Sequence, residues 1–336
     1  MEESDKKTMS FLYQIIMQNN SMPKVSVIIP VYGVENYIER CARSLFEQTL
    51  TDIEYIFVDD CSPDNSINIL ESVLEVYPNR RSQVKIIRHL ENKGLPTARK
   101  TGIDNSTGDY IIHCDSDDWV ETDMYRLMYD EAKRLDADIV MCGYKVTDGQ
   151  TVFSECYHQQ IDKTKLISSL LTLHEAWSVW NKMCKRTLYD NDIVYPSLAM
   201  GEDMVLTTQL VLKAQRIGVI DKALYNYFYN PNSITKVRSE SSRYKHWKDS
   251  AENAKTVISI FQTKGLEDKY ANELGYLKFL QKNLAGDLVR KKKYSKEWLE
   301  MFRDINRKVF FNPYISNSRK LIFLVKLLLA ETLKNV

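Results

Sequence analysis

The sequence predicts an α/β protein with a mostly parallel central sheet, followed by a helical C-terminal region. The first observation is a regular series of short apolar runs rich in β-branched residues, which is typical of strands buried on both faces of a sheet. The second is the helical spacing of apolar residues between those runs, because this alternation indicates a parallel sheet with right-handed crossovers. The third is the sequence after about residue 240, where the pattern is almost purely helical and rich in lysine.

The apolar runs give the expected strands in order. They are VSVIIPVY, EYIFVDD, VKIIR, YIIHC and DIVMCG, at 25–32, 54–60, 84–88, 110–114 and 138–143. Helical spacing separates them, most clearly over 38–45, 67–74 and 123–135. Beyond residue 150 the pattern is mixed, with a helix near 163–172, a second helix at GEDMVL and a strand at LYNYFY.

The chain of 336 residues suits one large domain with an appendage. We therefore expect a leader at 1–22, an α/β domain at 23–238 and a helical region at 239–336 that ends in an amphipathic helix.

Charge and cysteine content exclude several classes of protein. The formal net charge of +1 argues against a nucleic-acid partner. The six cysteines form no C-x-x-C pair, so neither a zinc site nor a disulfide framework is indicated. The N-terminus lacks the order of a signal peptide, and no stretch reaches the roughly 18 apolar residues that span a bilayer. We expect a cytoplasmic protein, at most attached to the inner face of the cell membrane.

Polar and acidic side chains gather where three of the expected strands end. Ligands of an open α/β sheet bind beyond these carboxyl ends. Several converging carboxylates repel one another unless a cation lies among them, and a hard divalent ion commonly shares its oxygen ligands with phosphates. The residues concerned are Pro30 and Tyr32, then Asp59 and Asp60, then Asp115, Ser116, Asp117 and Asp118.

Two glycine-rich phosphate-binding motifs are missing from the sequence. Neither G-x-x-x-x-G-K-[ST] nor G-x-G-x-x-G follows the first strand. If a nucleotide diphosphate binds, a metal must therefore do the work of such a loop. This combination points away from kinases and dehydrogenases and toward sugar nucleotides.

Several motifs resemble one known family in order and spacing. They are VSVIIPVYGVENYIERCARSLFEQTL, EYIFVDDCSPDNS, NKGLPTARKTGI and TGDYIIHCDSDDW, continued by WNKMCKRTLY, GEDMVLTTQLVLKA and LYNYFYNPNSIT. Together they cover residues 24–235 and resemble the family 2 glycosyltransferases, which have a GT-A-type nucleotide-binding sandwich. The resemblance implies an inverting enzyme that transfers a hexosyl or N-acetylhexosaminyl group from a nucleotide diphosphate sugar, with UDP as the expected nucleotide. The expected acceptor is a glycan or lipid-linked hydroxyl in cell-surface glycan or polysaccharide synthesis.

The resemblance also implies roles for individual residues. Asp117 would bind Mn²⁺ or Mg²⁺, with Asp115 nearer the ribose or the metal, and Asp203 would be the general base. The nucleotide sugar would lie against Tyr32 and Pro30, with Asp60 accepting a hydrogen bond from the base and Asn92 and Arg99 lining the site. The sequence departs from the family at Cys61, where glycine is commonest, and at His113, where an apolar residue is usual. We expect the turn at Cys61 to avoid positive φ.

Each assignment has a structural alternative. Asp115 and Asp117 could form a solvated turn, and Asp203 could serve only the helix N-terminus. Arg99 could be a structural ion pair and Asn92 a turn residue, while Asp59 or Asp60 could cap the next helix. Trp177, Trp180 and Tyr195 could stack on sugars or belong to the core.

Two other functional classes compete with the glycosyltransferase. An aspartate-nucleophile phosphotransferase would place D-x-D on its first strand and Thr or Val where Trp119 stands, whereas here at least three strands precede the motif. A non-catalytic nucleotide-sugar-binding relative would be favoured by the loss of Asp117 or Asp203, and both are present.

The last helix is strongly amphipathic. Residues 282–336 contain 13 Lys and Arg against 5 Asp and Glu. One arc of about 140° carries the charged residues, and the rest is apolar. Two explanations stay open: peripheral contact with anionic lipid, or docking on the main domain or a second subunit. The charged residues are Arg319, Lys320, Lys326, Glu331 and Lys334.

Overall fold

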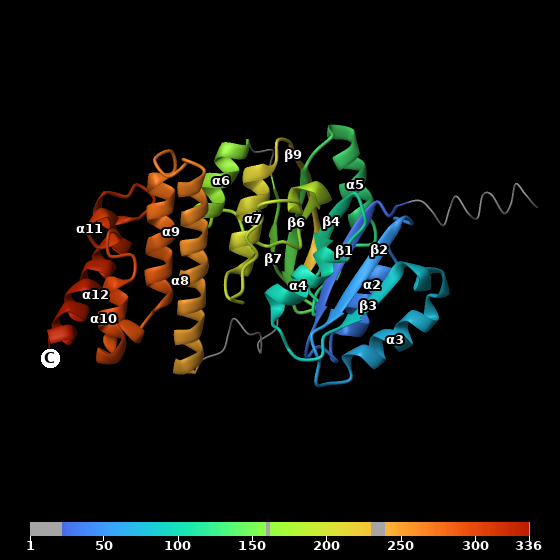
Figure 1. Ribbon diagram of the computed structural model, residues 1–336, viewed down its shortest axis with the longest axis horizontal. Helices are drawn as coiled ribbons and strands as arrows, with labels where there is room; N and C mark the ends of the chain where they lie inside the picture. Colours follow the sequence, from blue (N-terminus) through green and yellow to red (C-terminus); the bar gives the residue numbers. More distant parts are fainter. Residues whose placement is uncertain (1–21, 159–161, 230–238, 336) are drawn as a thin grey trace, which may run out of the picture.

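A computed structural model describes residues 22–158, 162–229 and 239–335 (Figure 1). The leader expected at 1–22 therefore lies, except for Met22, outside the described residues. The expected boundary between 238 and 239 falls at the edge of an undescribed segment and stays a prediction.

One nine-stranded mixed sheet forms the centre of the described structure, in the order β3-β2-β1-β4-β8-β6-β9-β5, with β7 paired to β6. The first four strands in this order are parallel, as are β6 and β9, whereas β5, β7 and β8 pair antiparallel. The prediction of a mostly parallel sheet is confirmed. The strands are β1 (Val25–Val31), β2 (Ile53–Asp59), β3 (Val84–Arg88), β4 (Tyr110–His113), β5 (Trp119–Val120), β6 (Ile139–Thr147), β7 (Val152–Cys156), β8 (Lys182–Lys185) and β9 (Ile217–Phe228).

Helices cover both faces of this sheet. Their bounds are α2 (Ile38–Phe46), α3 (Ser66–Val76), α4 (Leu95–Asp104), α5 (Met124–Leu135), α6 (Lys163–Leu171) and α7 (Glu202–Lys213). Successive side chains of a strand point to opposite faces, and β1 shows the result. Val25, Val27 and Ile29 enter the core with α2, α3 and α5, whereas Ile28 enters the core with α4, α6 and α7. A continuously apolar strand is therefore required here, because both faces are covered.

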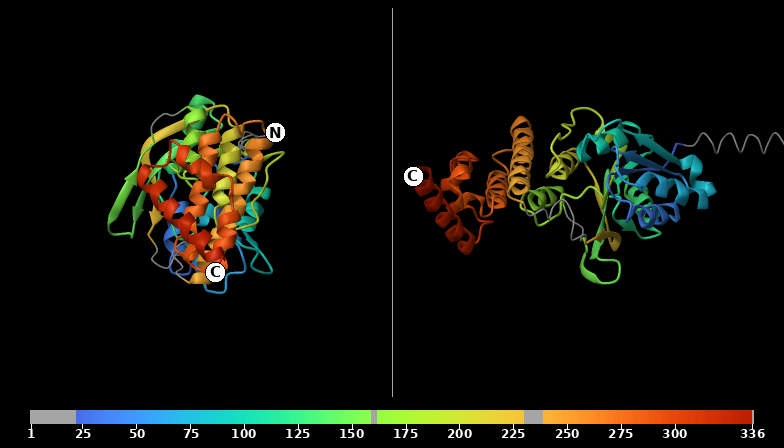
Figure 2. Two further views of the ribbon diagram at one scale, coloured as in Figure 1. Left: turned by 90° about the vertical axis from the view of Figure 1, so that its left-hand side faces the viewer. Right: turned by 90° about the horizontal axis from the view of Figure 1, so that it is seen from below.

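The C-terminal helices extend the molecule away from β1, β2 and β3 (Figures 1 and 2). They are α8 (Glu240–Thr263), α9 (Ala271–Leu284), α10 (Lys292–Glu300), α11 (Ile305–Lys308) and α12 (Asn317–Asn335), with short 3-10 turns η4 (Leu288–Arg290) and η5 (Val309–Phe311) between them. The long helix α8 connects the two parts. Its Val257 and Phe261 belong to the core under the sheet, whereas its Trp247 belongs to a third core with Phe279 and Trp298.

Candidate active site

The carboxyl ends of β1, β2 and β4 lie at one edge of the sheet because these strands are parallel. Pro30 is buried near the end of β1, opposite Val58 of β2. Tyr32 comes directly after β1 and is 49% exposed. Asn92 is also exposed, between β3 and α4, and among the described residues no hydrogen bond to its side chain is found. Tyr32 and Asn92 are thus exposed, whereas Pro30 is buried near the end of β1.

Asp60 is held in a cradle of hydrogen bonds immediately after β2. Its Oδ1 accepts from the backbone N–H of Lys93 at 2.8 Å and from His89 Nδ1 at 2.7 Å. Its Oδ2 accepts from the backbone N–H of Gly94 at 2.8 Å. An ionised carboxylate offers about four lone-pair sites, so one acceptor position at Oδ2 stays available. Asp60 is 3% exposed, and the cradle fixes the direction of that position.

Nothing in the sequence assigned a role to His89, although its side chain helps two backbone N–H groups to orient Asp60. Its second ring nitrogen, Nε2, lies 2.9 Å from Thr101 Oγ1 on α4. The ring therefore ties Asp60 to α4. No spacing motif marks His89, and only the β3 to α4 connection on the same sheet edge could have suggested it.

Cys61 adopts φ of +59°. The expectation that this turn avoids positive φ is wrong. The chain must turn sharply after Asp60, and the Asp59 carboxylate accepts a hydrogen bond from the backbone N–H of Ser62 at 2.8 Å in the same turn. In a residue other than glycine this left-handed conformation is strained.

Arg99 joins the end of β4 to the start of α7. Its Nη2 donates to Asp115 Oδ1 at 2.8 Å, and its Nε donates to Glu202 Oε1 at 2.7 Å. Arg99 is 4% exposed, and its Nη1 has no hydrogen-bond partner among the described residues. The two carboxylates raise the pKa of Arg99 against the effect of burial. Arg99 thus forms structural ion pairs with Asp115 and Glu202. Its Nη1 is a buried donor that no described residue accepts from.

The D-x-D turn contains one aspartate that is purely structural. Asp118 accepts the Tyr225 hydroxyl at 2.6 Å and the backbone N–H of Phe228 at 2.7 Å, which anchors the turn to β9. Arg40 of α2 donates to the Asp117 carbonyl at 2.9 Å while its guanidinium carbon lies 3.8 Å from the Trp119 ring centroid. These contacts fix the turn and leave the Asp117 carboxylate free of them.

The Asp117 carboxylate fits a divalent cation. Burial, followed by the nearby charge of Asp115, raises the pKa of Asp117 to about 6. No hydrogen bond or ion pair from another described residue to this carboxylate is found. A cation would offset both the lost hydration and the repulsion. Asp117, with Asp115 beside it, therefore has the chemistry of a metal ligand.

The expectation that acids from three strand ends gather around one cation is wrong for β2. Among the described residues no group of three His, Cys, Asp or Glu side chains could hold a metal. Asp60 is engaged by its own cradle instead. A magnesium-like ion bound by one or two carboxylates and by substrate phosphates needs no such cluster.

Asp203 lies at the first turn of α7, next to the Glu202 that Arg99 holds. One of its oxygens, Oδ1, accepts from the backbone N–H of Met204 at 2.8 Å. This oxygen serves the helix N-terminus, as the structural alternative holds, and the other oxygen does not. Burial raises the pKa of Asp203, while Arg99 opposes that shift. Burial also raises the pKa of Glu202 to about 7. The structure thus brings Arg99, Asp115, Glu202 and Asp203 together, with Asp117 electrostatically close to Asp115.

His113 takes the place of an apolar residue in β4. It is fully buried, and neither ring nitrogen has a partner among the described residues. Burial and then Arg99 hold the pKa of His113 well below its usual value. The neutral ring fills space in the sheet and removes no group that the site needs.

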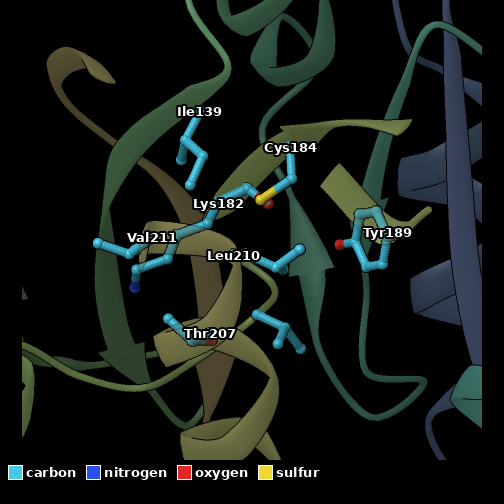
Figure 3. A pocket seen from close by; sticks show the side chains of 8 residues that line it. Ile139, Lys182, Cys184, Tyr189, Thr207, Leu210 and Val211 are labelled. Atoms are coloured by element: carbon cyan, nitrogen blue, oxygen red, sulfur yellow. Dashed lines mark hydrogen bonds between the residues drawn. The ribbon is translucent and has the colours of Figure 1, made fainter. Parts of the chain in front are cut away.

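The WSVWNKM segment belongs to the core. Trp180 is 8% exposed and stacks on Tyr225 with ring centroids 4.2 Å apart. Lys182 is buried, and its Nζ donates to carbonyl oxygens of Ala176 and Ser178. Figure 3 shows Lys182 among side chains of β6, β8 and α7 that face one another, and the space between them has no room for a water molecule. This motif therefore packs against α7, the helix that begins with Glu202 and Asp203.

Solved structures identify the class of fold as GT-A. Staphylococcus aureus TarS 1–349 in complex with UDP superposes with a TM-score of 0.66 at 21% identity, covering 93% of this chain and 90% of that chain. Mannosyltransferase PcManGT from Pyrobaculum calidifontis, in complex with GDP-Man and Mn²⁺, superposes with a TM-score of 0.53 at 14% identity, covering 93% and 87%.

The sequence itself gives the family. Residues 26–197 match Glycosyl transferase family 2. The uncharacterized glycosyltransferase EpsJ of Bacillus subtilis (strain 168) is 34% identical over 234 residues, or 67% of each chain. The poly(ribitol-phosphate) beta-N-acetylglucosaminyltransferase TarS of S. aureus (strain MW2) is 31% identical over 215 residues, which is 61% of this chain but 35% of TarS. The chain therefore belongs to glycosyl transferase family 2 and is a glycosyltransferase.

Proposed function

We propose that this glycosyltransferase inverts the anomeric centre while it moves a sugar from a UDP-linked donor to an acceptor hydroxyl of a cell-surface glycan. One observation carries the proposal: a single buried guanidinium, Arg99, joins the D-x-D aspartate Asp115 to the Glu202–Asp203 pair. The aspartate-nucleophile alternative loses its support, because the motif follows the fourth strand along the chain. The name of one relative supports a cell-surface polymer as the acceptor: it is the poly(ribitol-phosphate) beta-glucosyltransferase of Bacillus spizizenii.

The donor nucleotide would lie along the edge formed by β1 and β2. Tyr32 would cover one face of the base, with Pro30 behind it, and Asn92 would close the far side. The open lone pair of Asp60 would accept the imide N–H of uracil, a hydrogen bond that a fixed carboxylate makes selectively. TarS has been solved with UDP-GlcNAc, which supports a UDP-linked sugar for this site.

The diphosphate would meet Asp117, Asp115 and Arg99. A divalent ion held by Asp117 with Asp115 would neutralise the charge on the departing diphosphate. The free Nη1 of Arg99 would donate to a phosphate oxygen or to the sugar, which would satisfy a buried group that otherwise lacks a partner.

Asp203 would act on the acceptor. As the acceptor oxygen bonds to the anomeric carbon, the sugar–phosphate bond breaks on the opposite face and the configuration inverts. The free Asp203 oxygen would take the hydroxyl proton, and the raised pKa of this carboxyl makes it a stronger base than an exposed aspartate.

Donor use is tested directly by slow hydrolysis of nucleotide sugars. We expect a Mn²⁺-dependent release of UDP from at least one UDP-sugar in a panel that also contains GDP- and dTDP-sugars, with Asp117→Ala as the blank. Release that is equal in the blank, or UDP that gives no thermal stabilisation of the protein, would show a non-catalytic relative or a different donor.

Metal-dependent UDP binding is expected to weaken as the pH falls. An acid whose pKa is about 6 keeps its proton below that pH, and a protonated carboxyl cannot bind the ion. Affinity measured by calorimetry with Mn²⁺ should therefore drop by about ten-fold per pH unit below pH 6. In Asp117→Asn the Mn²⁺ effect should vanish at every pH, whereas the exposed Asp130→Asn should behave as wild type. A wild-type affinity that is flat from pH 7 to pH 5 would contradict the role of Asp117.

A further inference from the structure

Helix α12 turns half of its apolar side chains toward solvent. Leu321, Ile322, Val325 and Leu328 are 63%, 56%, 59% and 62% exposed, and Leu324 is 38% exposed. A surface helix normally buries such a stripe against its own domain. Several large apolar residues on one exposed face indicate an interaction surface rather than scattered surface leucines.

A narrow strip of α12 attaches it to the rest of the molecule. Phe323 and Ala330 are fully buried, and Phe323 lies 5.6 Å from Phe279 and 5.5 Å from Trp298 between ring centroids. Arg319 donates to the Tyr276 hydroxyl at 2.8 Å on the same side. The helix is thus docked on α9 and α10, and not on the α/β domain as one sequence-based alternative held. It docks through the strip between its charged residues, so the wide apolar face stays uncovered.

The exposed face forms one continuous arc. At about 100° per residue, positions from Leu324 through Leu321 and Val325 to Ile322 span about 160°. Within this arc of residues 321–333 the only polar side chain is Thr332. We call this surface the α12 face, defined by Leu321, Ile322, Leu324, Val325 and Leu328.

Basic side chains border the α12 face on both edges. On the same helical wheel Lys326 and Arg319 follow Ile322 on one side, and Lys320 and then Glu331 precede Leu324 on the other. Residues 301–334 contain seven Lys and Arg against two Asp and Glu. The basic segment around Arg290 is nearby, since its charge acts on Lys326. Arg319 and Lys326 each give one hydrogen bond to α9, to the Tyr276 hydroxyl and to Asn283 Oδ1. Their remaining donors, and Lys320, can reach anionic groups at the edges of the apolar face.

We infer that the α12 face lies on an anionic lipid surface, with Leu321, Val325 and Leu328 inserted at the boundary of the acyl chains and the bordering basic residues on the headgroups. The charge pattern selects this occupant. A second copy of the chain would bring two basic borders together, which is unfavourable, whereas anionic headgroups complement them. Among the described residues no helix is long and apolar enough to cross a membrane, so the contact is interfacial. The inference does not depend on the proposed function.

Vesicle binding by the full chain tests this inference. We expect the wild type to co-sediment with vesicles of phosphatidylglycerol and phosphatidylcholine, more weakly at high salt, and hardly at all with phosphatidylcholine alone. Leu321→Gln/Val325→Gln/Leu328→Gln should lower the partition coefficient at least about ten-fold. These side chains are exposed, so the thermal unfolding midpoint should not fall.

The matched control is Val76→Gln/Leu173→Gln, which changes side chains of similar exposure, 63% and 52%, outside α12. It should bind vesicles as the wild type does. Equal binding by the triple variant, or no wild-type binding to anionic vesicles, overturns the inference. Light scattering that shows a wild-type dimer and a monomeric triple variant, without vesicle binding, assigns the face to a second copy and overturns it as well. UDP-sugar hydrolysis in solution should be the same in all three proteins, which separates this test from that of the proposed function.

Discussion

Asparagine in place of Asp203 is expected to lower the rate of sugar transfer by about 10²–10⁴-fold, the usual contribution of a general base. The amide can still accept the backbone N–H of Met204, as Oδ1 of Asp203 does, so α7 should keep its first turn. It cannot take a proton from the acceptor hydroxyl. Transfer should be measured as kcat under saturating donor, with UDP affinity measured separately and expected to be unchanged.

The control for this change is Asp221→Asn, at an exposed carboxyl of β9. It should transfer sugar at the wild-type rate. Should Asp203→Asn retain transfer within a few-fold of the wild type, Asp203 would be only a helix-terminus residue. Weaker UDP binding together with slower transfer would instead place Asp203 in the donor site, which also contradicts the assignment.

Methionine in place of Arg99 is expected to lower the free energy of unfolding by about 3–5 kcal/mol, because removing one partner of a buried ion pair leaves uncompensated charge. Both Asp115 and Glu202 would lose their cation. Urea denaturation at pH 8 measures the effect. The exposed ion pair of Arg88 with Glu71 is the control, and Arg88→Met should cost less than about 1 kcal/mol.

The deficit of Arg99→Met should shrink as the pH falls. Burial already raises the pKa of Glu202 to about 7 in the wild type, above its unfolded value of about 4.3. A folded state that binds more protons than the unfolded state gains stability as the pH falls between these two values. Without Arg99 the folded pKa of Glu202 should rise further, so the gain is larger in the variant. A deficit that stays constant from pH 8 to pH 5 would show that Arg99 acts through packing and not through these charges.

The buried parallel strands at one side of the sheet were predictable from sequence, whereas the short strands β5, β7 and β8 were not. β1, β2, β3 and β4 lie within a residue or two of the expected runs, because both faces of a central parallel strand must be apolar. β5 has two residues, and β7 is almost entirely exposed, so neither has an apolar pattern to detect. Their pairing with β9 and β6 depends on backbone hydrogen bonds that any sequence can make.

The candidate site was predictable only in part. The residue types at the strand ends indicated Asp60, Asp115 and Asp117, because strand topology alone places them on one edge. Within DSDD, however, only the resemblance to the family separated Asp117 from Asp118, and nothing in the sequence showed which contacts anchor Asp118. That distinction arises because the Tyr225 hydroxyl and the Phe228 N–H reach Asp118 and not Asp117.

The sequence by itself determined the α/β class, the motifs shared with family 2 glycosyltransferases and the amphipathic pattern of the last helix, since periodicity and local residue types are properties of the chain. Only the tertiary structure decided that Asp60 is held by His89, that Arg99 joins Asp115 to Glu202, and that α12 turns its apolar face outward. Each of these depends on contacts between segments far apart along the chain. Such contacts follow from how whole elements pack, and no local pattern records them.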